Sequence, residues 1–248
     1  MIPYIEGQLV RHKIAIVTGA NRGIGKAICE TLLAHGCDVI ATVRDVNSAK
    51  TSLVPRSNLH FVQMDFNHED SVKSAVREIR KHTKTVDILI NNAGIAIGGL
   101  FQMTSIRDVR QLFEVNFFNQ LLLTQQVSRL MQRQKKGCVI NILSSATHQI
   151  DRGTLAYGSV KSALERASLS LAVELAESGI RVNAIAPGLT STDMADKMDE
   201  QARLDLISNS LLKKAAAPQD VANTALFLCS DLASHMTGQV LNVDGGLF

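Results

Sequence analysis

The chain has 248 residues, of which 26 are Lys or Arg and 23 are Asp or Glu, so its formal net charge is +3. With 46% hydrophobic residues and little net charge, it is too apolar for a disordered protein and too weakly basic for a typical nucleic-acid binder. No apolar run approaches the roughly 18 residues of a membrane-spanning helix, and no basic segment followed by an apolar core opens the chain. We therefore expect a cytoplasmic protein of one or two domains that binds neither nucleic acid nor membrane.

The cysteines and tyrosines limit the chemistry that the chain can carry. Four scattered cysteines form no CxxC pair and have no histidine at ligand spacing, so we expect no metal site and no disulfide framework, only buried thiols. These cysteines are Cys29, Cys37, Cys138 and Cys229. Only Tyr4 and Tyr157 are available for tyrosine chemistry.

Seven short apolar runs rich in β-branched residues predict strands along the chain. They span residues 14–18, 39–43, 59–64, 86–90, 139–143, 182–186 and 240–243. The longer stretches between them have apolar residues at helical spacing, as at Val72, Val76 and Ile79. Strands that alternate with helices predict a parallel sheet, and their continuous apolar character predicts helices on both faces. We expect one doubly wound α/β domain at 13–248, after an N-terminal tail at 1–12.

Residues 188–218 form the longest stretch inside the domain without a strand signal. Apolar residues such as Met194, Leu204 and Leu211 predict one or two short helices there. Because ligands of such sheets gather at the carboxyl ends of the strands, this segment is a candidate substrate lid, and a plain surface excursion is the alternative.

A glycine-rich turn, Thr18 to Gly25, follows the first predicted strand and opens the first predicted helix. Glycines let the backbone turn tightly and approach a pyrophosphate, which the free N–H groups at the helix start would bind. The residues expected at the phosphates are Gly19, Asn21, Arg22, Gly23, Ile24 and Gly25. A merely tight turn is the alternative.

Charge at the end of the second predicted strand bears on which dinucleotide would bind. An acid about 20 residues beyond the glycines usually accepts hydrogen bonds from the ribose 2′-hydroxyl of NAD(H), but Val43 stands there, followed by Arg44. Arg44 and Arg22 would together suit the 2′-phosphate of NADP(H), because guanidinium offers phosphate a planar fork. We expect NADP(H); NAD(H) stays open because the adjacent Asp45 could bind a ribose.

Tyr157 and Lys161 lie four residues apart in a stretch with helical periodicity, so their side chains share one helix face. Tyrosine is a poor proton donor near neutral pH because its usual pKa is about 10, and a neighbouring ammonium would lower that pKa. The pair therefore suits a lysine-tuned proton donor. A packed phenol beside a surface charge is the alternative.

Polar residues follow the fourth and fifth predicted strands at the edge where ligands gather. Ser144 is placed to hydrogen-bond a substrate oxygen, with Ser145 as its rival and a capping serine as the alternative. Asn91 and Asn92 end the preceding strand, and Asn116 lies on a helix face predicted to point inward.

The order and spacing of these motifs resemble the short-chain dehydrogenase/reductase family over residues 13–248. The matching features are the TGxxxGIG turn, Asp65, the NNAG motif at 91–94, Asn116, Ser144, the YxxxK pair, the Pro187-Gly188 turn with Thr192, and the closing Asp244-Gly245-Gly246. The resemblance implies a seven-stranded Rossmann fold and hydride transfer between nicotinamide and a ketone or alcohol.

The same resemblance implies a role for each site residue. Tyr157 would be the general acid in reduction, Ser144 would polarise the carbonyl, and Lys161 would hold the nicotinamide ribose. Asn116 would hold a water that relays protons to Lys161. The remaining cofactor contacts that it implies are Asp65, Phe66, Asn92, Ala93, Gly94, Pro187, Gly188, Thr190 and Thr192.

The substrate is less defined than the cofactor. Within the family, the chain is most similar to 3-oxoacyl-[acyl-carrier-protein] reductases, which implies an acyl thioester substrate and a homotetramer. Ser178 stands where such reductases often carry a basic residue, although Lys135 and Lys136 lie nearby. Ser145 and His148 are the candidate substrate contacts in the polar stretch 145–156. A free small polar ketone or alcohol is the alternative substrate, and a non-catalytic cofactor-binding regulatory protein is the more remote alternative.

Overall fold

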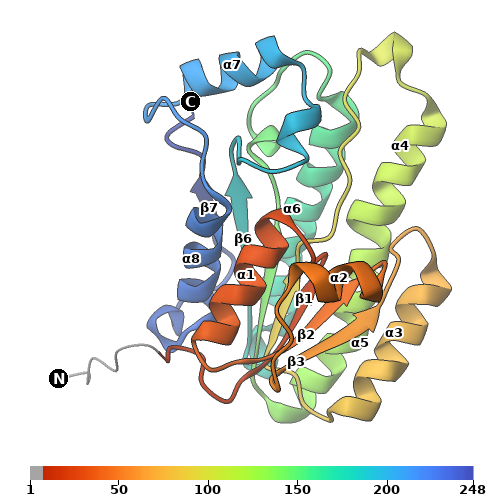
Figure 1. The fold of residues 1–248 in the computed structure, drawn as a ribbon, viewed down its shortest axis with the longest axis vertical. Helices are drawn as coiled ribbons and strands as arrows, with labels where there is room; N and C mark the ends of the chain where they lie inside the picture. The colour runs from red at the N-terminus through yellow and green to blue at the C-terminus, as the bar shows by residue number, and fades with distance from the viewer. Residues whose placement is uncertain (1–7, 248) are drawn as a thin grey trace.

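A computed structural model describes residues 8–247, and its centre is a single sheet of seven parallel strands (Figure 1). The strands are β1 (Ile14–Thr18), β2 (Asp38–Val43), β3 (Leu59–Gln63), β4 (Ile88–Asn91), β5 (Gly137–Ile142), β6 (Ile180–Pro187) and β7 (Val240–Val243). Their order across the sheet is β3-β2-β1-β4-β5-β6-β7. The order reverses direction between β1 and β4, which makes the predicted doubly wound Rossmann fold and opens a crevice at the carboxyl ends of these strands.

Helices cover both faces of the sheet. They are α1 (Gly23–Ala34), α2 (Val46–Ser52), α3 (Glu69–His82), α4 (Ile106–Phe113), α5 (Asn119–Gln134), α6 (Leu155–Leu175), α7 (Glu200–Asn209) and α8 (Pro218–Cys229). Along β1, Ala15 and Val17 pack toward α1 and α8, whereas Ile16 packs toward α3 and α5. Both faces of this strand are therefore buried, which explains its uninterrupted apolar sequence.

Short helical turns link several of the long elements. One-turn 3-10 helices lie at η1 (Phe101–Met103), η3 (Ser145–Thr147), η4 (Ala176–Ser178), η5 (Ala195–Lys197) and η6 (Asp231–Ala233). Residues Glu114–Phe118 form a π-helical turn, η2, between α4 and α5. Among the residues described, no helix is both long enough and apolar enough to span a membrane.

The N-terminal boundary of the domain differs from the sequence prediction. Residues 8–12, assigned to a tail, form a turn in which Val10 is completely buried against the core beside α1. The His12 amide also donates to the Gly36 carbonyl. The packed domain thus includes Val10, because this apolar side chain, four residues before Ile14 at the start of β1, is still buried against the core. Residues 1–7, including Tyr4, lie outside the described part of the chain.

The candidate lid at 188–218 contains the short helices that its apolar spacing predicts, η5 and α7. A parallel bridge between Thr190 and Ala216 ties the two ends of the segment together. In Figure 1, α7 lies at the end of the molecule toward which the arrow of β6 points. The segment is therefore an excursion from a fixed base, located where the strand ends meet.

Candidate active site

The glycine-rich turn between β1 and α1 has the backbone geometry of an anion cradle. Gly19 and Gly23 both have positive φ, at 64° and 53°, a conformation that favours glycine. A Cβ on Gly25 would collide with the Gly19 carbonyl and the Asn92 amide, so this position also needs glycine. No side chain caps the start of α1 and no acid lies in its first turn, so its N–H groups suit an anionic group.

The NNAG motif after β4 is fastened to this cradle. The Thr18 hydroxyl accepts hydrogen bonds from the backbone amides of Asn92 and Ala93, both at 2.9 Å. The Asn92 side chain donates to the Thr18 carbonyl at 2.8 Å, and the Gln120 side chain donates to the Ala93 carbonyl at 2.6 Å. These bonds make the ends of β1 and β4 one rigid unit at the point where the strand order reverses.

The charged groups around the cradle already have defined neighbours. Arg22, ahead of α1, has its Nη1 3.2 Å from Asp193 Oδ2, at the start of the candidate lid. Arg44 is exposed directly after β2, and the last residue of this strand is Val43 rather than an acid. The Asp45 carboxylate caps α2 by accepting from the amides of Asn47 and Ser48. Oδ1 of Asp45 therefore serves as the cap of α2.

Asp65 and Phe66 follow β3 on the far side of Arg44. Burial raises the pKa of Asp65, but hydrogen bonds from Asn67 and the charges of His68 and Arg44 outweigh it and lower the pKa overall. Phe66 is buried, and its carbonyl accepts from the Asn119 amide at 2.9 Å.

Ser144 and Tyr157 meet at the end of β5. Ser144 lies directly before η3, and its hydroxyl is close enough to the Tyr157 phenol to lower the pKa of that phenol. Its Oγ also accepts from the Ala146 amide at 3.2 Å. The two candidate catalytic hydroxyls are therefore paired by a short loop and the first turn of α6.

Lys161 lies one helical turn beyond Tyr157, with Nζ 5.9 Å from the centre of the phenol ring. Its Nζ donates to the Ile142 carbonyl at 2.7 Å, and burial lowers the pKa of this amine to about 8. Burial raises the pKa of Tyr157 to about 12, opposed only by the Ser144 hydrogen bond. The expectation that Lys161 lowers this pKa is thus not met here, because the amine faces a carbonyl and the phenol is desolvated.

Asn116 lies in the π-helical turn and is completely buried. Its side chain binds both backbone groups of Ile95, accepting from the amide at 2.9 Å and donating to the carbonyl at 2.8 Å. A Cβ on Gly94 would lie 2.8 Å from Asn116 Oδ1. The inward Asn that the sequence predicts thus holds the loop after β4, and π-helical turns often occur at functional sites.

The segment after β6 passes close to the glycine-rich turn. Gly188 follows Pro187, the last residue of the strand, and its amide donates to the Val243 carbonyl at 3.0 Å. The buried Thr190 hydroxyl donates to the Gly188 carbonyl, and the Thr192 side chain reaches Gly23. The two segments that the sequence predicts at the cofactor, the glycine-rich turn and the stretch after β6, are therefore in contact.

The candidate substrate loop lies beside the turn after β7. Ser145 is buried, whereas the His148 side chain is 37% exposed and has its Nε2 3.7 Å from Asp244 Oδ2. Sequence reasoning named Asp244 only as part of the closing motif and did not single out Asp193. No local pattern marks either residue, because the partner of Asp244, His148, and the partner of Asp193, Arg22, are both far away in the sequence.

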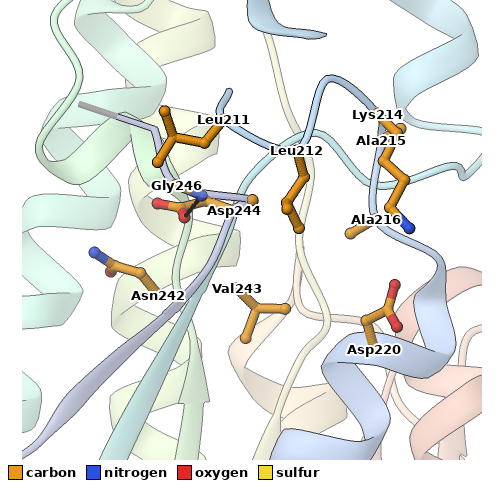
Figure 2. Close-up of a pocket in the computed structure, with 11 residues that line it drawn as sticks. Leu211, Leu212, Lys214, Ala215, Ala216, Asp220, Asn242, Val243, Asp244 and Gly246 are labelled. Atoms are coloured by element: carbon orange, nitrogen blue, oxygen red, sulfur yellow. Dashed lines mark hydrogen bonds between the residues drawn. The ribbon is translucent and has the colours of Figure 1, made fainter. Parts of the chain in front are cut away.

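A pocket of about 380 Å³ opens between the exit of the candidate lid and the turn after β7 (Figure 2). Leu211 and Leu212 form one wall, and Asn242, Val243 and Asp244 form the other. Backbone bonds from Leu211 and Leu212 to the carbonyls of Gly246 and Gly245 join the two walls. The pocket therefore adjoins the site at Asp244, which contacts Gly188.

Comparison with known proteins gives matches over almost the whole chain. A family model described as enoyl-(acyl carrier protein) reductase matches residues 19–248. The chain is similar to a 3-oxoacyl-[acyl-carrier-protein] reductase of Aquifex aeolicus, with 38% identity over 241 residues that cover 95% of this chain and 97% of the relative.

Two solved structures extend the comparison to the fold. A short chain dehydrogenase/reductase family protein matches with a TM-score of 0.87 and 32% identity, covering 96% of this chain and 98% of that protein. A 7α-hydroxysteroid dehydrogenase, complexed with NADH and 7-oxo glycochenodeoxycholic acid, matches with a TM-score of 0.90 and 31% identity, covering 96% and 95%. The similarity spans the cradle, the paired hydroxyls and the segment after β6.

Proposed function

The chain belongs to the short-chain dehydrogenase/reductase family and is an oxidoreductase of C=O and CH–OH groups, and on this premise we propose that it reduces a ketone with NADPH. The pairing of Ser144 and Tyr157 beside the anion cradle carries this proposal. When bound, the nicotinamide supplies the hydride. The residues of the chain bind the cofactor, orient the carbonyl and donate the proton.

Tyr157 is the proton donor in the proposed reaction. Burial raises the pKa of its phenol to about 12, so the phenol is protonated at physiological pH and holds the proton to be donated; an ammonium at Lys161 would lower this pKa and ease the donation. Ser144 lies against the same hydroxyl and donates to that oxygen as negative charge develops on it. Lys161 and Asn116 complete the proposed site: Lys161 would hold the nicotinamide ribose, and Asn116 would hold a relay water.

NADP(H) is the proposed cofactor, with NAD(H) as the alternative. Three observations support the 2′-phosphate: Arg44 follows β2, Arg22 lies ahead of α1, and the Asp45 carboxylate is used as a helix cap. The steroid dehydrogenase relative is complexed with NADH, so membership of the family does not by itself choose between the two.

We propose a 3-oxoacyl thioester as the substrate and a free ketone or alcohol as the alternative. The name of the Aquifex relative supports the thioester, whereas the steroid dehydrogenase shows that similar folds accept unrelated ketones. Exposed apolar residues on the candidate lid, Met194, Met198 and Leu204, suit an acyl chain. Ser145 and His148, in the stretch 145–156, are the proposed substrate contacts.

We also propose that the working form of the enzyme is a cytoplasmic homotetramer.

A panel of carbonyl compounds tests this function. Purified enzyme and NADPH are mixed with an acetoacetyl thioester, a steroid ketone and a small polar ketone, and the loss of NADPH absorbance is followed. Fastest turnover of the thioester supports the proposal, and faster turnover of the small ketone supports the alternative. Cofactor binding without turnover of any carbonyl compound would leave the remote alternative, a non-catalytic binding protein.

A further inference from the structure

Asp244, at the end of β7, has an unusual environment for a carboxylate. Its side chain is only 6% exposed. Oδ1 accepts from the Gly246 amide at 2.9 Å, whereas Oδ2 is buried and has no hydrogen-bond partner among residues 8–247. A buried carboxylate oxygen without a donor is costly. The candidate donor near it is His148 Nε2, 3.7 Å away.

The imidazole of His148 lies between two protein oxygen atoms. Nε2 faces Asp244 Oδ2, and Nδ1 lies 3.3 Å from the Thr147 hydroxyl. With a hydrogen on Nε2, the ring turns a donor toward the Asp244 carboxylate, while Nδ1 contacts the Thr147 hydroxyl, whose own hydrogen is donated to the Ser144 carbonyl at 3.0 Å. Both nitrogens therefore face protein oxygens.

Asp244 also touches the segment expected at the nicotinamide. A Cβ on Gly188 would lie 2.8 Å from both Cα and Cβ of Asp244, so the two backbones are in close contact. Gly188 directly follows β6, and His148 lies four residues after Ser144. One carboxylate therefore faces the loop that carries the catalytic serine and the segment that would bind the cofactor.

We infer that Asp244 and His148 are positioning residues that fasten the loop 145–154 to the turn after β7 and so shape the substrate pocket. His148 acts through Asp244 rather than as a direct donor to the substrate. The inference deepens the proposed function, but its first test is a measurement on the loop that needs no turnover.

Limited trypsin cleavage after Arg152, an exposed residue of the same loop, measures how often the loop opens. We expect His148→Ala and Asp244→Ala each to speed this cleavage about fivefold, and the double variant to be no faster than either, as for two partners of one interaction. His148→Gln keeps a donor and restores slow cleavage. Ile150→Ala, at a 98% exposed position of the loop, is the matched control and leaves the rate unchanged. Cleavage after Arg56, in the exposed loop before β3, is the internal reference.

A kinetic measurement follows with whichever ketone the enzyme turns over. His148→Ala should raise the KM for the ketone several-fold, leave the Kd of NADPH unchanged, and be rescued by His148→Gln. Wild-type cleavage after Arg152 in His148→Ala, or effects of the two alanine variants that multiply, would overturn the inference. An inactive enzyme with the expected cleavage pattern would contradict only the proposed function.

Discussion

The cradle at β1 and β4 and the wall formed by residues 145–156 with the candidate lid are built in different ways. The cradle is held by backbone geometry and by part-buried hydrogen bonds that Asn92 donates to Thr18. The candidate lid presents exposed apolar side chains such as Met194 and Leu204 and is tied down mainly at its base. A cofactor common to many enzymes is thus matched by fixed backbone, whereas the substrate is matched by side chains that can vary without loss of the fold.

The largest expected effect comes from removing the proton donor that lies between these regions. Tyr157→Phe should lower kcat/KM about 10²- to 10⁴-fold, the usual contribution of a general acid. The substitution removes one hydroxyl, so circular dichroism and NADPH binding should match the wild type. Retention of most of the turnover by this variant, with its fold intact, would exclude Tyr157 as the donor.

A change confined to the cradle should affect the cofactor and spare the substrate. Arg44→Gln should raise the KM for NADPH about 10- to 100-fold, because hydrogen bonds to a charged phosphate are strong, and should leave the KM for NADH nearly unchanged. Arg107→Gln, another exposed arginine on α4, is the matched control. Equal losses with both cofactors would place Arg44 away from the 2′-phosphate.

The buried Lys161 makes a pH-dependent prediction about stability. Its pKa is lowered by burial from 10.5 to about 8, so between pH 8 and 10 the unfolded chain binds more protons at this group than the folded chain. The free energy of unfolding should therefore rise with pH in this window, by at most about 1.4 kcal/mol per pH unit from this group. Urea unfolding of wild type and Lys161→Met measures the difference, and curves that run parallel would contradict the shift.

The smallest expected effect concerns the contact between the two regions. Asp193 pairs with Arg22, so the proposed 2′-phosphate must compete with it for the guanidinium. Asp193→Asn should tighten NADPH binding about two- to fivefold, in keeping with an exposed ion pair, and leave NADH binding unchanged. Asp196→Asn breaks a different pair, with Arg203, in the same segment and serves as the control. Calorimetric titration distinguishes the variants, and equal NADPH affinities would show that Asp193 does not compete.

Local sequence predicted much of the fold because parallel strands buried on both faces leave a clear apolar signal. Strands β1 and β7 begin and end where their apolar runs do. The prediction began β4 two residues early, since Val86 is buried but its amide donates to the Gln134 side chain. The π-helical turn at Asn116 has no comparable local signal, because it depends on the contact with Ile95.

The candidate site, like the fold, could be predicted from local sequence only in part. The motifs placed Ser144 at a strand end and Tyr157 on the following helix, and in the structure Ser144 is close enough to Tyr157 to lower the pKa of its phenol. The direction of the Tyr157 pKa required the packing around it, which no motif contains. The partners of Arg22 and His148 come from the distant residues Asp193 and Asp244, and only the folded chain brings them together.

The most direct test of the account is the cofactor preference of the wild-type enzyme on a single ketone. Steady-state kcat/KM is measured with NADPH and with NADH under identical conditions. The arginines at the cradle and the use of Asp45 as a helix cap predict that NADPH is preferred by about tenfold or more. Equal or higher efficiency with NADH would contradict the assignment of the cradle to a 2′-phosphate.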